Sequence, residues 1–256
     1  MAGIRRERQG PLAVLRLDKA RGNAIDETLV EELRAACREL EADDGVRGVL
    51  LASAHPKLFC PGLDLVSLIE FDRPRLQRFM TAFGEMVSAL YGLRRPVVAA
   101  VSGHAVAGGC ILAMTADWRV LRRGGVTIGL NEVKVGVPLP LSVSALLRAT
   151  VSPGALSRVA LLGRNFADEE ALAAGLADEL ADEAKFEAAC LARLQEFAEK
   201  DTYSLAVTKT YLRADALRQM KAENPVAVAE WLDGWFSPAT QARIRATVES
   251  LARKSG

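Results

Sequence analysis

Two glycine-marked turns and one acidic residue after them constrain this chain more than any other feature. The turns are 60–65 (CPGLDL) and, about 45 residues later, 107–110 (AGGC), and the acid is Glu132. Each turn follows a strand-like run and precedes a helix-like run, so each presents unpaired backbone N–H groups and positive potential. Two such ends meeting at one point would form an oxyanion hole. A single carboxylate beside that hole is the minimal equipment for moving a proton next to a thioester.

Each of these motifs also has a purely structural interpretation. The glycines would then only cap helices or allow close packing, and Glu132 would be a surface glutamate at a helix start. Either turn alone favours the structural interpretation, whereas both turns in this order favour the oxyanion hole. Asp64 is expected to be structural or to cap the helix after the first turn.

Composition narrows the class of protein. The 256 residues suffice for one large domain or two small ones, half of them are hydrophobic, and the net charge is +1. Such a charge provides no field to attract nucleic acid or a membrane, so neither partner is expected. Local arginine clusters at 5–8, 94–95 and 119–123 are interpreted as solvated surface, with contacts to ligand phosphates as the alternative.

The cysteines and histidines argue against a metal site. Four scattered cysteines without a CxxC pattern make metal ligation and a disulfide framework unexpected. His55 and His104 are interpreted as structural, because neither has an obvious nucleophilic partner. The sequence contains neither an apolar run of membrane-spanning length nor a secretory h-region, so we expect a cytoplasmic protein.

Periodicity predicts an α/β core followed by a helical tail. Strands are expected at 13–17, 46–52, 97–101, 118–121 and 126–128, with helices at 26–41, 74–90 and 108–115 between them. After residue 140 helical patterns take over, at 142–149, 153–162, 168–174, 182–199, 203–220, 225–234 and 238–253. No flexible linker precedes the tail, so it is expected to pack on the core or on a neighbouring subunit.

The order of the motifs 22–25 (GNAI), 59–65 (FCPGLDL), 96–103 (PVVAAVSG) and 107–110 (AGGC) resembles the crotonase (enoyl-CoA hydratase/isomerase) superfamily. The resemblance runs from about residue 12 to the C-terminus. It implies an α/β fold: a crotonase-like spiral core of ββα turns over 1–195, which binds CoA and carries the catalytic site. It also implies a C-terminal helical trimerisation region over 196–256, and hence a homotrimer or a dimer of trimers.

The same resemblance implies roles for individual residues. The oxyanion donors would be the backbone N–H groups of Leu63 and Gly108. Family members that hydrate a double bond typically use two glutamates, and here Ile111 occupies the first position and Glu132 the second. One carboxylate in an apolar pocket, with its pKa raised by burial, suits proton transfer better than water addition. We therefore expect a Δ3,Δ2-enoyl-CoA isomerase of unsaturated fatty acid β-oxidation.

Rival interpretations are a hydratase or another acyl-CoA enzyme on the same scaffold, and a non-catalytic binding homologue. The expected ligand is an acyl-CoA substrate, with no separate cofactor and no metal. The resemblance places CoA against 19–25 and 61–65, where Lys19 or Arg21 would pair with a phosphate. The expected substrate-binding residues are Asn23, Ala24, Ile25, Pro61, Gly62, Leu63, Asp64, Leu65, Gly108, Ile111 and Asn131.

Two further positions complete the expectations. Asn131 is expected to help orient Glu132 or the acyl chain. Trp231, Trp235 and Phe236 are interpreted as core or trimer packing, with the lining of an acyl tunnel as the alternative.

Overall fold

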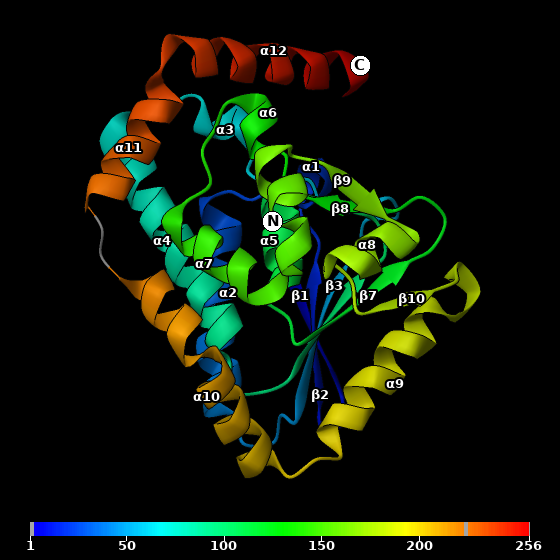
Figure 1. The fold of residues 1–256 in the computed structure, drawn as a ribbon. Helices are drawn as coiled ribbons and strands as arrows, with labels where there is room; N and C mark the ends of the chain where they lie inside the picture. The colour runs from blue at the N-terminus through cyan, green and yellow to red at the C-terminus, as the bar shows by residue number, and fades with distance from the viewer. Residues whose placement is uncertain (1–2, 223–224, 256) are drawn as a thin grey trace.

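The fold is built on two β-sheets that the chain enters alternately (Figure 1). The computed structural model describes residues 3–222 and 225–255. The larger sheet, in spatial order, contains β1 (Ile4–Gln9), β2 (Leu12–Leu17), β3 (Gly48–Ser53), β5 (Val97–Val101), β7 (Trp118–Arg122) and β10 (Glu179–Ala181). The smaller sheet contains β4 (Leu58–Cys60), β6 (His104–Val106), β8 (Thr127–Gly129) and β9 (Asn165–Ala167). β2, β3, β5, β7 and β10 run parallel, and β1 is an antiparallel edge.

Successive passes of the chain repeat one pattern, which confirms the expected spiral of ββα turns. β3, β5 and β7 each lie in the larger sheet, and each is followed by a strand of the smaller sheet, namely β4, β6 and β8. A helix then leads back. The helices are α1 (Ala20–Asn23), α2 (Glu27–Ala42), α3 (Leu65–Leu68), α4 (Arg73–Gly92), α5 (Gly108–Met114), α6 (Glu132–Val135), α7 (Leu141–Thr150), α8 (Asp168–Ala174), α9 (Phe186–Ala198), α10 (Thr202–Lys221), α11 (Pro225–Phe236) and α12 (Pro238–Ser255).

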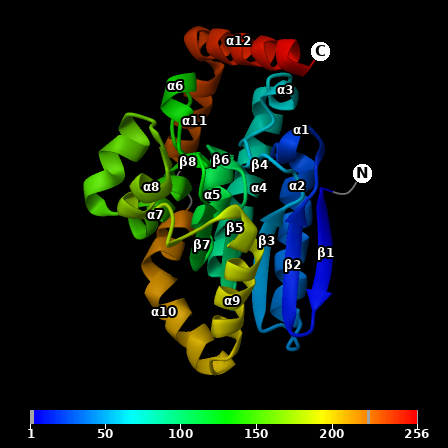
Figure 2. The same cartoon turned by 90° about the vertical axis from the view of Figure 1, so that its right-hand side faces the viewer.

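Both faces of the larger sheet are buried at β3, β5 and β7, which explains why these central strands read as continuous apolar runs. Val14, Leu50 and Val98 are register partners that pack toward α9, where Leu194 is fully buried. The alternate residues of the same strands join the main core with α2, α4 and α5. Figure 2 shows α9 and α2 on opposite sides of these strands.

Several expected elements form where local signals placed them. Asp26 caps α2, because its side chain accepts a hydrogen bond from the Leu29 N–H at 2.9 Å. Asp72 caps α4 in the same way. The expectation of one helix over 153–162 is wrong. A 3₁₀ turn at Pro153–Ala155 is followed by a π-helix at Ser157–Leu161, whose bond from Leu162 N to Ser157 O spans five residues.

The helical tail packs on the core of its own chain, one of the two places expected. α10 lies against α4 and α7, α11 against α4, and α12 across α3 and α6 (Figure 1). Met220, Trp231, Trp235 and Ile244 belong to the main hydrophobic cluster. The core interpretation of Trp231 and Trp235 is therefore confirmed within a single protomer. Residue 195 lies inside α9, and the division into 1–195 and 196–256 stays a prediction.

Candidate active site

The first glycine turn crosses the segment before α2. Ile25 forms an isolated bridge with Leu63: its N–H donates to Gly62 O at 2.8 Å, and its carbonyl accepts from Asp64 N at 2.9 Å. Gly62 has a φ of 102°, a conformation that glycine adopts without strain. Within residues 3–222 and 225–255, the Leu63 N–H has no hydrogen-bond acceptor. The turn therefore leaves one donor free beside Ile25.

The second turn is strained and tightly packed against the first. Ala107 has φ 52° and ψ −121°, which is rare for a residue with a side chain. A Cβ on Gly109 would lie 1.9 Å from Cys60 O, and one on Gly62 would lie 3.1 Å from Gly108 N. The glycines are thus required by backbone contact between the turns. In the described part of the chain, the Gly108 N–H also lacks an acceptor.

Glu132 follows the strand that lies beside the second turn. β6 and β8 are paired at Val106 and Gly129, and Ala107 N donates to Gly129 O at 2.9 Å. Glu132 is the first residue of α6, three residues after β8 ends. Burial raises the pKa of the Cys110 thiol in α5, and the charge of Glu132 adds to that rise, so the carboxylate lies within electrostatic reach of that helix.

Glu132 is half-buried as a residue, but its carboxylate oxygen Oε2 is buried and unpaired. Oε2 has no hydrogen-bond partner among the described residues. Burial raises the pKa of Glu132 to about 7, and backbone N–H groups of Glu132 and Asn131 oppose that rise. Glu132 does begin a helix, as the structural interpretation expects, but burial of Oε2 distinguishes it from a solvated surface glutamate. Its role as a base stays a prediction. A base with a pKa near neutrality can both accept and return a proton.

Ile111 and Asn131 flank these groups in sequence. Ile111 is buried in the first turn of α5, where its N–H donates to Ala107 O at 3.0 Å. Asn131 precedes Glu132 at the N-terminal cap position of α6, but its side chain does not cap the helix. The contacts of both side chains with an acyl group stay predictions.

The side chain of Asn23 supports the first turn through three hydrogen bonds. Its Oδ1 accepts from Lys19 N at 2.8 Å, and its Nδ2 donates to Ser53 Oγ at 2.8 Å and Phe59 O at 3.0 Å. Because the amide is buried and occupied, it supports the loop that carries Ala24 and Ile25. Sequence reasoning missed this supporting role, although Asn after Gly is typical of a left-handed turn, and the φ of Asn23 is 71°.

The basic residues near the first turn are paired with the chain's own carboxylates. Arg21 Nη1 lies 2.8 Å from Asp64 Oδ2, and Lys19 Nζ lies 2.9 Å from Asp26 Oδ2. Asp64 is buried and accepts a bond from Ser67 Oγ at 2.7 Å, which confirms its structural, capping role. Arg21 remains about half exposed, and its contact with a CoA phosphate stays a prediction.

The structural interpretation of the two histidines is confirmed. His55 accepts bonds from the backbone of Lys57 and Leu58, and His104 contacts Thr127. Most of the clustered arginines pair with carboxylates of the same chain. These pairs are Arg5–Asp18, Arg6–Glu39, Arg8–Asp43, Arg95–Asp44, Arg119–Asp178, Arg122–Glu183 and Arg123–Glu169. Arg95 and Arg119 are buried, however, so the expectation of solvated surface is wrong for these two.

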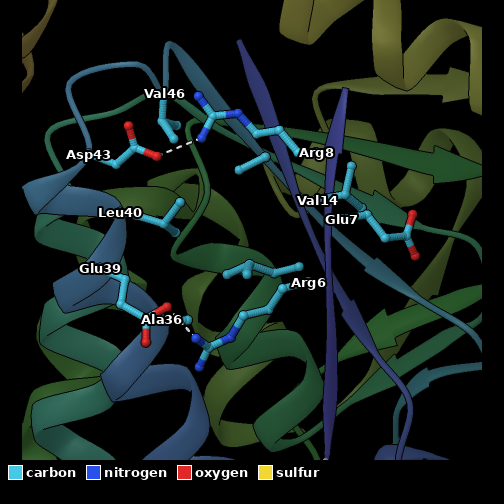
Figure 3. Close-up of a pocket in the computed structure, with 11 residues that line it drawn as sticks. Arg6, Glu7, Arg8, Val14, Ala36, Glu39, Leu40, Asp43 and Val46 are labelled. Atoms are coloured by element: carbon cyan, nitrogen blue, oxygen red, sulfur yellow. Dashed lines mark hydrogen bonds and ion pairs between the residues drawn. The ribbon is translucent and has the colours of Figure 1, made fainter. Parts of the chain in front are cut away.

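A surface pocket of about 230 Å³ lies away from these turns, between β1, β2 and α2 (Figure 3). Charged side chains rim it, but Arg8 is paired with Asp43 and Arg6 with Glu39. Since those charges already have partners, this pocket is not the candidate site. Among the described residues, no group of three or more His, Cys, Asp or Glu side chains could hold a metal ion. In the same residues, no helix is long and apolar enough to span a membrane.

The fold and the paired turns define the class of protein. The family model for enoyl-CoA hydratase/isomerase matches residues 7–233, and the chain belongs to that family. Human mitochondrial enoyl-CoA delta isomerase 1 is 26% identical over 246 residues, which cover 96% of this chain and 82% of the relative. A probable enoyl-CoA hydratase from Mycobacterium tuberculosis is 31% identical over 199 residues, covering 77% of this chain and 75% of the relative.

Solved structures agree with the sequence comparisons. The crystal structure of human mitochondrial delta3-delta2-enoyl-CoA isomerase matches with a TM-score of 0.94 at 25% identity, over 99% of this chain and 100% of that one. An enoyl-CoA hydratase from Mycobacterium marinum matches with a TM-score of 0.81 at 27% identity, over 90% of this chain and 99% of that one. The crotonase fold expected from the sequence is therefore confirmed.

Proposed function

We propose that this protein is a Δ3,Δ2-enoyl-CoA isomerase of unsaturated fatty acid β-oxidation. The observation that carries the proposal is the buried Glu132 carboxylate, unpaired at Oε2 and with a pKa of about 7. Ile111, an apolar residue, occupies the position where the resemblance places the second acid of a hydratase. The similarity to human enoyl-CoA delta isomerase 1 over nearly the whole chain supports the same choice.

The reaction uses one base and two backbone donors. The Glu132 carboxylate removes a proton from C2 of a 3-enoyl thioester, and the C–H electron pair delocalises into the carbonyl as a dienolate. The N–H groups of Leu63 and Gly108 stabilise the negative oxygen, and each donor of this kind contributes about 3 kcal/mol. The protonated Glu132 then delivers the proton to C4. The double bond moves to C2–C3, and the carboxylate is regenerated.

The raised pKa of Glu132 also determines how kcat/KM changes at acidic pH. The base must be ionised to accept the C2 proton, and its pKa is raised to about 7. We therefore expect kcat/KM to fall as the pH decreases below about 7. The ligand is an acyl-CoA substrate held against 19–25 and 61–65. No separate cofactor is proposed, and the cytoplasmic location stays a prediction.

Two assays run side by side distinguish the rival functions. Purified protein is given 3-hexenoyl-CoA and crotonyl-CoA side by side, and formation or loss of the conjugated enoyl thioester absorbance is followed. An isomerase forms the conjugated product and hydrates crotonyl-CoA slowly or not at all. Hydration at a rate matching isomerisation would identify a hydratase, a possibility that similarity to the mycobacterial probable hydratase keeps open. Inactivity on both would favour a binding homologue or another acyl-CoA enzyme.

Glu132→Gln tests the base in the same assays. The variant keeps the shape of the side chain and removes its ability to accept a proton. We expect isomerisation to fall by more than about a hundredfold, with binding of the CoA ester retained. A variant that keeps over about a tenth of the wild-type kcat would show that another residue is the base.

A further inference from the structure

The segment that follows Glu132 is held by the C-terminal helices. Gly136 N and Val137 N each donate to the backbone carbonyl of Glu132 at 3.0 Å, which ties the residue to 136–137. α6 contains only four residues, too few to keep its own geometry in water. Oε2 of Glu132 has no partner in the described chain, so hydrogen bonding does not fix that oxygen. The backbone N–H groups of Asn131 and Glu132 act on the carboxylate locally, so the place of the carboxylate depends on where this backbone is held. Contacts made beyond α6 hold it.

α12 supplies the first of these contacts. Thr240 Oγ1 donates to Gly136 O at 2.9 Å, and Thr240 is only 3% exposed. Gly136 has a φ of 90°, and a Cβ there would lie 2.7 Å from Arg243 Nη1 and 3.0 Å from Thr240 Oγ1. One turn further along α12, Ile244 is fully buried. The helix thus lies directly against the turn that ends α6, as Figure 1 shows.

α11 supplies the second contact. Trp231 Nε1 donates to Pro138 O at 2.8 Å, and its ring stacks on Trp235 with centroids 5.5 Å apart. A Cβ on Gly234 would lie 3.1 Å from Pro138 Cδ, so α11 and this proline are in close contact. Thr240 and Trp231 therefore donate to the carbonyls of the two residues that flank Val137.

We propose that Thr240 and Trp231 are positioning residues for the general base, because they fix the segment 136–138 to which the backbone of Glu132 is bonded. The inference rests on the proposed function of Glu132. Neither residue touches the reacting atoms; each acts through the backbone. Sequence reasoning assigned the tail to packing or oligomerisation, with the lining of an acyl tunnel as the alternative. It missed this contribution, since the pattern of α12 does not distinguish Thr240 from its other polar residues.

Thr240→Val removes the donor and keeps the shape, and Thr240→Ser restores a hydroxyl. The matched control is Thr247→Val on the same helix, where Oγ1 donates to Arg243 O within α12 and to no other group of the described residues. We expect Thr240→Val to lower kcat about ten- to a hundredfold with KM changed less than about threefold. Thr240→Ser and the control should stay close to wild type. Trp231→Phe, which keeps the aromatic ring and removes the N–H, should act as Thr240→Val does.

The pH profile separates positioning from general stability. A carboxylate released from its buried position reaches water, so the midpoint of the acid limb should move from about 7 toward the ordinary glutamate range. The charged or titratable groups that neighbouring elements bring to this segment are Cys110 of α5 and Arg243 of α12, with Lys134 on α6 itself. None of them is altered in these variants.

A second measurement does not depend on activity. Infrared titration of the carboxyl band, assigned as the signal that Glu132→Gln removes, reports the pKa of Glu132 in the free protein. A lowered midpoint in Thr240→Val or Trp231→Phe supports positioning, even if the wild type isomerises no substrate and the proposed function fails. Unchanged midpoints in both folded variants, with kcat altered no more than in Thr247→Val, would overturn the inference.

Discussion

At the scale of single residues, burial of one carboxylate determines what this site can do. Glu132 lies in a short helix between two core segments, and burial is the largest cause of its raised pKa. The same burial costs stability whenever the residue is charged. The unpaired Oε2 shows that no hydrogen bond from the described residues offsets this cost at that atom.

Glu132→Gln should therefore stabilise the protein in a pH-dependent manner. Above pH 7 Glu132 is ionised in both the folded and unfolded states, and the folded state bears the full cost of the buried charge. As the pH falls through about 7 the folded state binds a proton first, and the cost is relieved. We expect the variant to gain on the order of 3 kcal/mol at pH 8 and about 1 kcal/mol at pH 5.

Urea unfolding at the two pH values measures this gain. Glu249→Gln, at an exposed position of α12, is the control and should show no pH-dependent gain. Equal stability of Glu132→Gln and wild type at pH 8 would show that the carboxylate is solvated.

Ile111→Glu tests why the site should isomerise and not hydrate. Ile111 is 3% exposed in the first turn of α5. It follows Cys110, whose pKa is raised by burial and, secondly, by the charge of Glu132. A glutamate there would create the paired carboxylates that water addition requires, and the pair would titrate as a coupled unit. We expect measurable hydration of crotonyl-CoA, detected as a loss of enoyl thioester absorbance. We also expect slower isomerisation of 3-hexenoyl-CoA, detected as a slower gain of that absorbance. Ile111→Gln should gain no hydration, and a folded Ile111→Glu that hydrates no better than Ile111→Gln contradicts the explanation.

At the scale of elements, a buried charge network attaches α10 to the core. Asp117 bonds Lys209 Nζ at 2.6 Å, Arg213 Nη2 at 2.8 Å and Val97 N at 2.7 Å. Burial lowers the pKa of Lys209 to about 8, and the charge of Asp117 opposes that change. Arg213 also donates to the carbonyls of Thr115 and Ala116. Lys209 likewise donates to Arg95 O at 2.8 Å. Backbone carbonyls therefore share these donors, but Asp117 supplies the negative charge that both cations contact.

Asp117→Asn should destabilise the protein strongly, because it leaves two buried cations without a counter-charge. Removing one partner from a buried ion pair costs about 3–5 kcal/mol. Asp215→Asn is the matched control on α10, where an exposed pair with Arg218 contributes at most about 1 kcal/mol. Thermal unfolding of both variants measures the difference. Similar midpoints for Asp117→Asn and Asp215→Asn would show that the network does not anchor α10.

At the scale of the whole molecule, several helices carry large apolar side chains that the protomer leaves exposed, and α10 carries the most exposed of them. Tyr203, Tyr211 and Leu212 of α10 are 73%, 76% and 82% exposed. Large exposed apolar side chains gathered on one element are typical of protein interfaces. They agree with the proposed assembly into a trimer or a dimer of trimers through the helical region.

Leu212→Glu should weaken that assembly without unfolding the protomer. A charge buried at a subunit interface is costly, whereas at this exposed position of the protomer it is not. Sedimentation velocity should show the wild type as a multiple of 27.5 kDa and the variant shifted toward the protomer mass. Gln9→Glu, at an exposed position of β1, adds the same charge elsewhere and should leave the mass unchanged. A monomeric wild type would contradict the proposed oligomer.

Local signals in the sequence were sufficient for the buried strands, the capped helices and both glycine turns. They missed β1, whose charged residues suit an edge strand paired on one side only, and the three-residue strands β4, β6, β9 and β10, which are too short to show a pattern. Helix caps and apolar runs depend on neighbours within a few residues, so the chain specifies them before it folds.

Tertiary structure alone decided how the turns and the base are arranged. Sequence reasoning named Gly62 and Gly108, but only the fold presses their backbones together. Sequence reasoning likewise named Glu132, but the burial of its carboxylate oxygen results from the fold. The contacts that hold segment 136–138 come from Thr240 and Trp231, which lie about 100 residues later in the chain. Such contacts depend on how whole elements pack, and packing depends on every buried side chain together. The sequence by itself therefore determined the chemical groups and their order, and the tertiary structure decided their arrangement and the pKa of Glu132.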